Sequence, residues 1–214
     1  MEYLEHGDLQ RYLERPLAEA ETRDIAFQVL EGLKHMHDNR FIHRDLKPGV
    51  GSPPAPKQSP RCSQLQNIMV VQRGPDWWVK IADFGISKRR HDLTTRQTAR
   101  QGTLGFAAPE AIGVSSDGGD GPYSTAADLW SLGAVIFQAL TNQSAFQNFA
   151  ELAEYCFGTR KFPVNTLQTF TVSDLGQDFV TSLMLLKPKE RPLADRALQH
   201  PWREATLSTT CISM

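Results

Sequence analysis

The chain has few cysteines, almost no net charge and no long uninterrupted apolar run. Its 214 residues include three cysteines, and the formal net charge is −1. Three widely spaced cysteines favour a reducing compartment, so we expect an intracellular protein, cytoplasmic or nuclear. The charge balance gives no sign of a nucleic-acid partner. The longest apolar stretch, 129–140, is interrupted by Ser131 and Gln138 and is too short to span a bilayer, so we expect no transmembrane segment.

The first residues, MEYLEHGDL, are acidic and unlike a secretory signal peptide. The remaining composition, with 40% hydrophobic and 22% charged residues, is typical of one soluble globular domain. Five segments fit helices by apolar spacing, namely 19–37, 124–140, 149–157, 174–186 and 193–199. Asp8 is a plausible N-cap of a short earlier helix. These elements predict a mostly helical fold.

One β-hairpin is expected within this helical chain. The runs 67–71 and 77–82 are rich in β-branched and aromatic residues and flank the turn signal QRGPD. Residues 88–101 are polar and lack periodicity, and are predicted to form a loop. The fold class is therefore α+β, a mostly helical unit with one short hairpin.

Three short strings carry most of the recognisable chemistry. FIHRDLKP occupies 41–48, IADFG occupies 81–85, and GTLGFAAPE occupies 102–110. Asp45 in the first string is a carboxylate that could accept a proton, and Lys47 is a cation that could lie beside a phosphate. In this order the strings resemble the catalytic loop, metal-binding loop and activation-segment end of a serine/threonine protein kinase. Three such strings in order make a chance match very unlikely.

The resemblance implies ATP and Mg²⁺ as cofactors and a protein hydroxyl as substrate. It makes Asp45 the base that deprotonates the hydroxyl and Lys47 the cation that stabilises the transferred phosphoryl group. Asn67 and Asp83 become the proposed magnesium ligands, since both supply hard oxygens. Lys47 favours serine/threonine over tyrosine specificity, as does Thr103, which in this class supports the catalytic aspartate.

The resemblance also assigns nucleotide-binding and structural positions. Residues 1–8 resemble the segment that links the two kinase lobes, where Glu2 and Leu4 would offer backbone groups to adenine and Asp8 would lie near the ribose. Glu110 and Arg191 are expected to form a buried ion pair. The structural positions implied are His43, Phe84, Glu110, Asp128 and Arg191.

Regulation by phosphorylation follows from the Arg-Asp pair in the first string. Arg44 precedes Asp45, which implies a site switched by a phosphothreonine that pairs with Arg44. Thr98 is the preferred candidate, with Thr94 and Thr95 as rivals. An upstream activating kinase would then be a partner.

The resemblance covers a partial kinase domain, 1–203, followed by a short tail, 204–214. The sequence contains no Gly-rich loop and no strand lysine to hold the ATP phosphates, so we expect this polypeptide by itself to be an inactive fragment. The alternative is a catalytically inactive kinase-like module that binds partners. The ending Cys211-Ile-Ser-Met matches a prenylation box in outline, although Ser213 is not aliphatic.

An irregular insert, 50–66, separates the first string from Asn67. Its 17 residues are rich in proline and serine, and removing them restores the kinase-like string HRDLKPGNIMV. Valine codons begin with GT and a glutamine codon can be CAG, the bases that begin and end a spliced intron. One hypothesis is therefore a retained intron translated in frame. The other is a genuine surface loop, because loops tolerate insertions.

Overall fold

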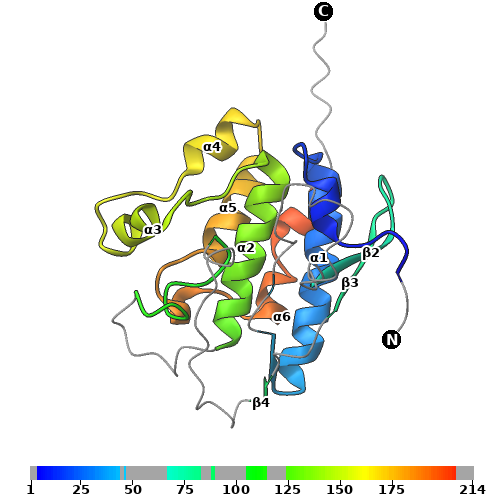
Figure 1. Ribbon diagram of the computed structural model, residues 1–214, viewed down its shortest axis with the longest axis horizontal. Helices are drawn as coiled ribbons and strands as arrows, with labels where there is room; N and C mark the ends of the chain where they lie inside the picture. Colours follow the sequence, from blue (N-terminus) through cyan, green and yellow to red (C-terminus); the bar gives the residue numbers. More distant parts are fainter. Residues whose placement is uncertain are drawn as a thin grey trace, which may run out of the picture.

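The computed structural model describes residues 4–43, 46, 67–82, 88–89, 105–114 and 124–205. Helices dominate this part of the chain, and the long helices α1 and α2 lie side by side at its centre (Figure 1). The α-helices are α1 Glu19–Asp38, α2 Thr125–Thr141, α3 Phe149–Cys156, α4 Val164–Thr169, α5 Asp174–Leu183 and α6 Ala194–Ala197. Short 3₁₀ helices cover η1 Leu9–Tyr12, η3 Pro188–Glu190 and η4 Pro201–Glu204. The strands are β1 Phe41–Ile42, β2 Ile68–Gln72, β3 Trp78–Ile81 and β4 Lys88–Arg89.

Helix α1 follows the predicted span closely. Glu21 accepts a hydrogen bond from the backbone N–H of Ala18, which supports the first turn, and two acidic residues there suit the positive end of the helix. The helix ends where Arg40 adopts a positive φ of 64°. Its apolar stripe is buried, and the buried side chains include Ile25, Val29, Leu30 and Leu33.

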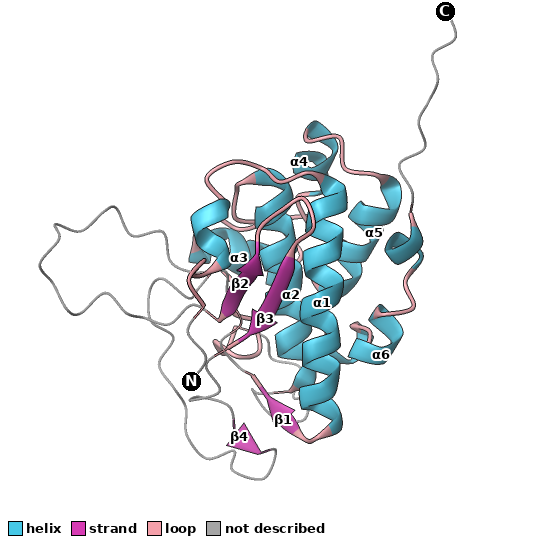
Figure 2. Ribbon diagram, turned by 90° about the vertical axis from the view of Figure 1, so that its right-hand side faces the viewer, coloured by secondary structure: helices cyan, strands magenta, loops and turns pink. Residues whose placement is uncertain are grey.

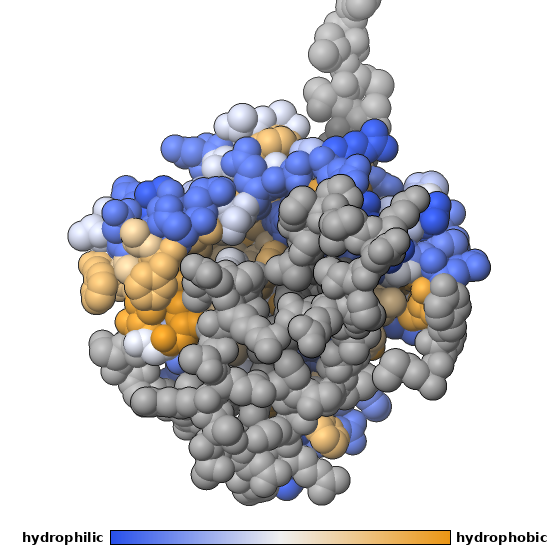
Figure 3. Space-filling model, viewed as in Figure 1, coloured by the Kyte–Doolittle hydropathy of each residue, from blue (hydrophilic) through white to orange (hydrophobic). Residues whose placement is uncertain are grey.

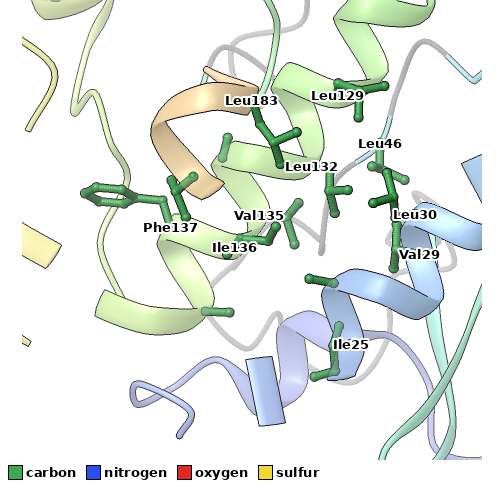
Figure 4. Close-up of a cluster of buried hydrophobic side chains, with 14 of the residues drawn as sticks. Ile25, Val29, Leu30, Leu46, Leu129, Leu132, Val135, Ile136, Phe137 and Leu183 are labelled. Atoms are coloured by element: carbon green, nitrogen blue, oxygen red, sulfur yellow. The ribbon is translucent and has the colours of Figure 1, made fainter. Parts of the chain in front are cut away.

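Helix α2 is buried along almost its whole length, as its apolar sequence predicts. Figure 4 shows its Leu129, Leu132 and Val135 beside Leu30 of α1 and Leu183 of α5. A Cβ on Gly133 would lie 2.6 Å from Met184, so glycine lets the end of α5 approach α2. The core is therefore a helix–helix interface built around α2.

Strands β2 and β3 form the predicted hairpin. They pair antiparallel with Val70 opposite Val79, and the register shifts between Val70 and Gln72. In Figure 2 the hairpin lies against α1, with β3 between β2 and that helix. The fold class expected from the sequence is confirmed.

The expectation that 88–101 is entirely loop is wrong at its start. Lys88–Arg89 forms β4, which pairs antiparallel with β1, Phe41–Ile42. Two-residue strands are too short to show alternation, and their pairing partner is remote in sequence. Residues 90–101 lie outside the described part of the chain.

Several boundaries also differ from the sequence expectations. Helix α5 ends at Leu183 rather than 186, because Arg191 draws in the carbonyl groups of Leu185 and Leu186 as hydrogen-bond acceptors. Helix α6 is shorter than predicted, and α4 was not predicted at all because its six residues bury only Leu167. Asp8 occupies the N-cap position of η1 but makes no capping hydrogen bond through its side chain.

Apolar surface is exposed around α3 (Figure 3). Phe149 begins this helix with 51% of its surface exposed, and Phe157 follows it with 75% exposed. Exposed aromatic side chains at both ends of one short helix depart from the usual apolar-inside pattern.

Candidate active site

The carboxylate of Asp128 ties the start of the first string to two helices. Asp128 is 1% exposed and stands in the first turn of α2, where helix N–H groups favour a negative charge. Its Oδ2 atom accepts a hydrogen bond of 2.9 Å from the backbone N–H of His43. The same oxygen lies 2.9 Å from Nε2 of His37, in the last turn of α1. Asp128 therefore fixes the backbone just before Arg44 and Asp45.

His43 extends this connection to the hairpin. Its Nε2 atom lies 3.2 Å from the backbone carbonyl oxygen of Ala82, the residue before Asp83. Ala82 in turn donates its N–H to the carbonyl oxygen of Asn67 at 2.9 Å. Asn67 and His43 are both buried, at 1% exposed each. A continuous path of hydrogen bonds therefore joins His43, two residues before Asp45, to Ala82, which precedes Asp83, and to Asn67.

Leu46 anchors the chain between Asp45 and Lys47. Its side chain is 1% exposed and belongs to the main apolar core. Figure 4 shows it beside Leu30 of α1 and near Leu129 of α2. Burial of this side chain anchors Leu46 itself to the core.

The segment expected to meet adenine and ribose runs beside the hairpin. Gly7 accepts a hydrogen bond of 2.8 Å from the N–H of Val70, and Asp8 forms a β-bridge with Met69. The Asp8 carboxylate lies 3.7 Å from Nε of Arg11. The structure therefore brings Gly7 and Asp8 beside β2, the strand that Asn67 precedes.

Glu110 and Arg191 form a two-pronged ion pair in the interior. Nη1 of Arg191 lies 2.6 Å from Oε1 of Glu110, and Nη2 lies 2.9 Å from Oε2. The Arg191 side chain is fully buried. Its other N–H groups donate hydrogen bonds to the carbonyl groups of Ala126, Leu185 and Leu186. Its guanidinium carbon lies 4.9 Å from the centre of the Trp130 ring. Each nitrogen of the guanidinium donates a hydrogen bond, so the ion pair holds the end of the third string against α2 and against the chain after α5.

Two titratable groups near this ion pair have raised pKa values. Burial raises the pKa of the Tyr155 phenol, and the charge of Arg191 opposes that rise. Burial also raises the pKa of the Cys156 thiol, and the carboxylate of Glu110 adds to it. At neutral pH both side chains are expected to be uncharged, which suits their packing beside α2.

The structure does not describe every residue that the sequence singled out. Leu4, Asp8, His43, Asn67, Glu110, Asp128 and Arg191 are described. The positions outside the described residues are Glu2, Arg44, Asp45, Lys47, Asp83, Phe84, Thr98 and Thr103. The catalytic and ligand-binding roles proposed for residues of either group stay predictions.

His37 was missed by the sequence reasoning, although it shares the Asp128 carboxylate with His43. Its position in the last turn of α1 gave no local signal, because its partner is 91 residues away. Ser131 was also missed as a site residue, and its hydroxyl donates to the carbonyl of Phe106 in the third string at 2.8 Å. Both contacts depend on the packing of distant helices.

Replacing Asp128 with alanine is expected to lower the free energy of unfolding by about 1.5–3 kcal/mol, because the buried N–H of His43 loses a charged acceptor. Urea unfolding followed by circular dichroism measures the change. Asp178 provides a matched control, since its exposed carboxylate lies 3.0 Å from Nε2 of His200. Asp178→Ala is expected to cost under about 1 kcal/mol. Equal losses from the two variants would contradict the proposed importance of Asp128.

The family model for the protein kinase domain matches residues 1–49 and 64–203. Among curated proteins, the chain is 30% identical over 205 residues to the serine/threonine-protein kinase cds1 of Schizosaccharomyces pombe, and the match covers 94% of this chain and 40% of that protein. It is 32% identical to the serine/threonine-protein kinase RAD53 of Saccharomyces cerevisiae, over 94% of this chain and 24% of that protein. The chain therefore spans less than half the length of these relatives.

A solved structure of the Rad53 kinase domain and SCD2 in complex with AMPPNP superposes with a TM-score of 0.71 at 28% identity. The match covers 97% of this chain and 70% of that one. A longer Rad53 structure, residues 1–466 in complex with AMP-PNP, gives a TM-score of 0.70 at 29% identity, over 95% of this chain and 46% of that one.

Two properties of the described residues concern metal binding and membranes. Within the part of the chain that is described, no three His, Cys, Asp or Glu side chains gather closely enough to hold a metal ion. In the same residues, no helix combines the length and apolar character needed to cross a bilayer.

Proposed function

Because this chain belongs to the protein kinase domain family, we propose that it supplies the large-lobe half of a serine/threonine kinase active site. The reaction is transfer of the γ-phosphoryl group of ATP to a serine or threonine hydroxyl of a protein. The observation that carries the proposal is the hydrogen-bonded path from Asp128 through His43 and Ala82 to Asn67. This path includes Asn67 and passes close in sequence to Asp45 and Asp83, the polar residues that such a reaction needs.

The proposed chemistry begins with positioning. Phosphoryl transfer needs the hydroxyl, the phosphate and the charge-stabilising groups to be held in line, so a rigid frame is the main requirement. Asp45 accepts the proton of the hydroxyl as it attacks the γ-phosphorus, and the bond to the β-phosphate oxygen breaks. Lys47 stabilises the negative charge on the transferred group. Thr103 supports Asp45 through its hydroxyl.

Asn67 and Asp83 are the proposed magnesium ligands. An amide oxygen and a carboxylate are hard donors of the kind Mg²⁺ prefers, so the residue types fit the ion. The closeness of Asn67 to Ala82, which precedes Asp83, supports a shared site. Magnesium bound there would neutralise charge on the ATP phosphates. Leu4 and Glu2 would offer backbone groups to adenine, with Asp8 near the ribose.

The substrate class rests on two kinds of support. Curated relatives carry the name serine/threonine-protein kinase, and the residues Lys47 and Thr103 agree with that class. Structures of a relative in complex with AMPPNP support a nucleotide site. Regulation is proposed to act through Arg44 and a phosphothreonine, preferably Thr98, added by an upstream kinase. We expect an intracellular location.

The polypeptide of residues 1–214 alone is expected to transfer no phosphoryl group from ATP. It contains no Gly-rich loop or strand lysine, so half of the usual phosphate clamp is missing from it. The experiment is a radiolabelled ATP assay on four proteins. These are residues 1–214 with and without the small lobe of S. pombe cds1 fused before Met1, each with and without residues 50–66.

We expect magnesium-dependent transfer when the small lobe is present and 50–66 are removed. If circular dichroism shows that all four proteins are folded and none of them transfers phosphoryl groups, the kinase proposal is contradicted. It would favour the second candidate, a kinase-like module that binds partners without catalysis. The intact Asp45, Lys47, Asn67 and Asp83 count against this candidate.

The segment 50–66 has its own test. The family model leaves residues 50–63 outside its match, which supports the view that this stretch is foreign to the domain. Sequencing the transcript across the codons for Asp45 to Val71 distinguishes the two hypotheses. Absence of the stretch from the mature transcript identifies it as a retained intron, and its presence identifies a genuine loop.

A further inference from the structure

The side chain of Gln28 makes two hydrogen bonds to the backbone of the second hairpin strand and the residue before it. Its Oε1 atom accepts a bond of 2.9 Å from the N–H of Val79, and its Nε2 donates a bond of 2.7 Å to the carbonyl oxygen of Trp77. Both partners are backbone groups two residues apart. A neighbouring strand would pair with these two groups in the same way, accepting from one and donating to the other.

The orientation of β3 explains why these groups are available. In an antiparallel pair the N–H and C=O groups of alternate residues face the partner strand. The N–H of Ala82 donates to Asn67, which precedes β2, so the backbone groups of Val79 face away from β2. Among the described strands, β2 alone pairs with β3. The amide of Gln28 therefore takes the place of a strand on the other edge of β3.

The face of α1 that carries Gln28 follows β3 from end to end. Seven residues before Gln28, Glu21 accepts a hydrogen bond of 2.9 Å from the indole N–H of Trp77. Four residues after it, Gly32 lies so close to β3 that an added Cβ would be 2.9 Å from Ile81. Positions 21, 28 and 32 share one helix face. One face of α1 thus meets alternate positions of the strand, Trp77, Val79 and Ile81.

We propose that Gln28 is a positioning residue of the active site, which acts by fixing the place and register of β3. The strand ends one residue before Ala82, and Ala82 makes the bonds to both His43 and Asn67. The register of β2 and β3 shifts near Gln72 and Trp78, so pairing with β2 alone holds this region weakly. The role of Asp83 after Ala82 rests on the proposed function, whereas the effect of Gln28 on β3 does not.

The test is amide hydrogen exchange of the full 214-residue chain, followed residue by residue by NMR, in the wild type and in Gln28→Leu. The substitution removes both bonds but keeps an apolar stem of similar length. We expect protection of the Val79 and Ala82 amides to fall roughly 10- to 100-fold while that of Ile136 in α2 is unchanged. Gln177→Leu is the matched control, because Gln177 makes one side-chain bond to Val172 in another part of the fold.

A second variant separates positioning from bulk packing. Gln28→Glu keeps an oxygen that can accept from Val79, but its ionised carboxylate repels the Trp77 carbonyl oxygen. Protonation restores a donor, so protection of Val79 and Ala82 is expected to recover between about pH 6.5 and about pH 4, relative to the wild type at each pH. A merely structural loss would not be regained in this way. This variant also decides the matter if Gln28→Leu does not fold.

The outcomes are distinct. A loss of amide protection confined to Val79 and Ala82, with recovery of that protection in Gln28→Glu on acidification, supports the proposal. The proposal is overturned if Gln28→Leu leaves the protection of Val79 and Ala82 unchanged or lowers that of Ile136 equally. It is also overturned if Gln28→Glu does not recover protection on acidification. None of these measurements depends on catalysis. They can therefore be interpreted even if the kinase proposal fails, and the kinase assay can be interpreted even if the proposal for Gln28 fails.

Discussion

Replacing Asp45 with asparagine is expected to lower kcat roughly 100- to 10,000-fold in the small-lobe fusion that lacks residues 50–66. Asparagine has nearly the same shape but cannot accept the proton of the attacking hydroxyl. The loss should fall on kcat rather than on KM for ATP, because the base acts in the transition state and contributes little to nucleotide binding.

Steady-state assays with varied ATP and a serine-containing peptide measure both constants. Asp76→Asn serves as the control, since Asp76 is exposed in the hairpin turn and the same change of charge there should leave kcat within about twofold of the parent. A kcat for Asp45→Asn within tenfold of the parent would remove Asp45 as the base. The proposed reaction would then need another proton acceptor.

The largest effect on stability is expected from the buried ion pair. Arg191→Met is expected to lower the free energy of unfolding by about 3–5 kcal/mol, because it leaves the buried Glu110 carboxylate without its partner. The change also removes donors from the carbonyl groups of Ala126, Leu185 and Leu186. Domains are commonly stable by only about 5–15 kcal/mol, so the variant should be near the limit of folding.

Urea unfolding of the 214-residue chain measures this loss, with Arg203→Met as the matched control. Arg203 makes a single-pronged contact of 3.0 Å with Glu31 at the surface, where both side chains are about half exposed, and its loss should cost about 0–1 kcal/mol. The double variant Arg191→Met with Glu110→Leu should regain part of the stability, since no charge is then left buried. Equal losses from Arg191→Met and Arg203→Met would show that burial adds nothing to the pair.

The sequence predicted the long helices and the hairpin well because their signals are local. Helix 19–37 was expected and Glu19–Asp38 is observed, since apolar side chains repeat at helical spacing within that segment. The three strings likewise carried the family resemblance, and the family match bears it out. Short elements such as α4 and the β1–β4 pair were missed, because two to six residues hold too little pattern.

The sequence by itself determined which residues could carry the chemistry and which segments form long helices. Only the tertiary structure decided which of these groups share a partner. Asp128 joins His37 and His43, and Gln28 holds the backbone around β3, across separations of 49 to 91 residues. Such pairings depend on how whole helices pack, since a single buried carboxylate or amide selects its partner by position in space. The spacing of residues along the chain does not predict that position.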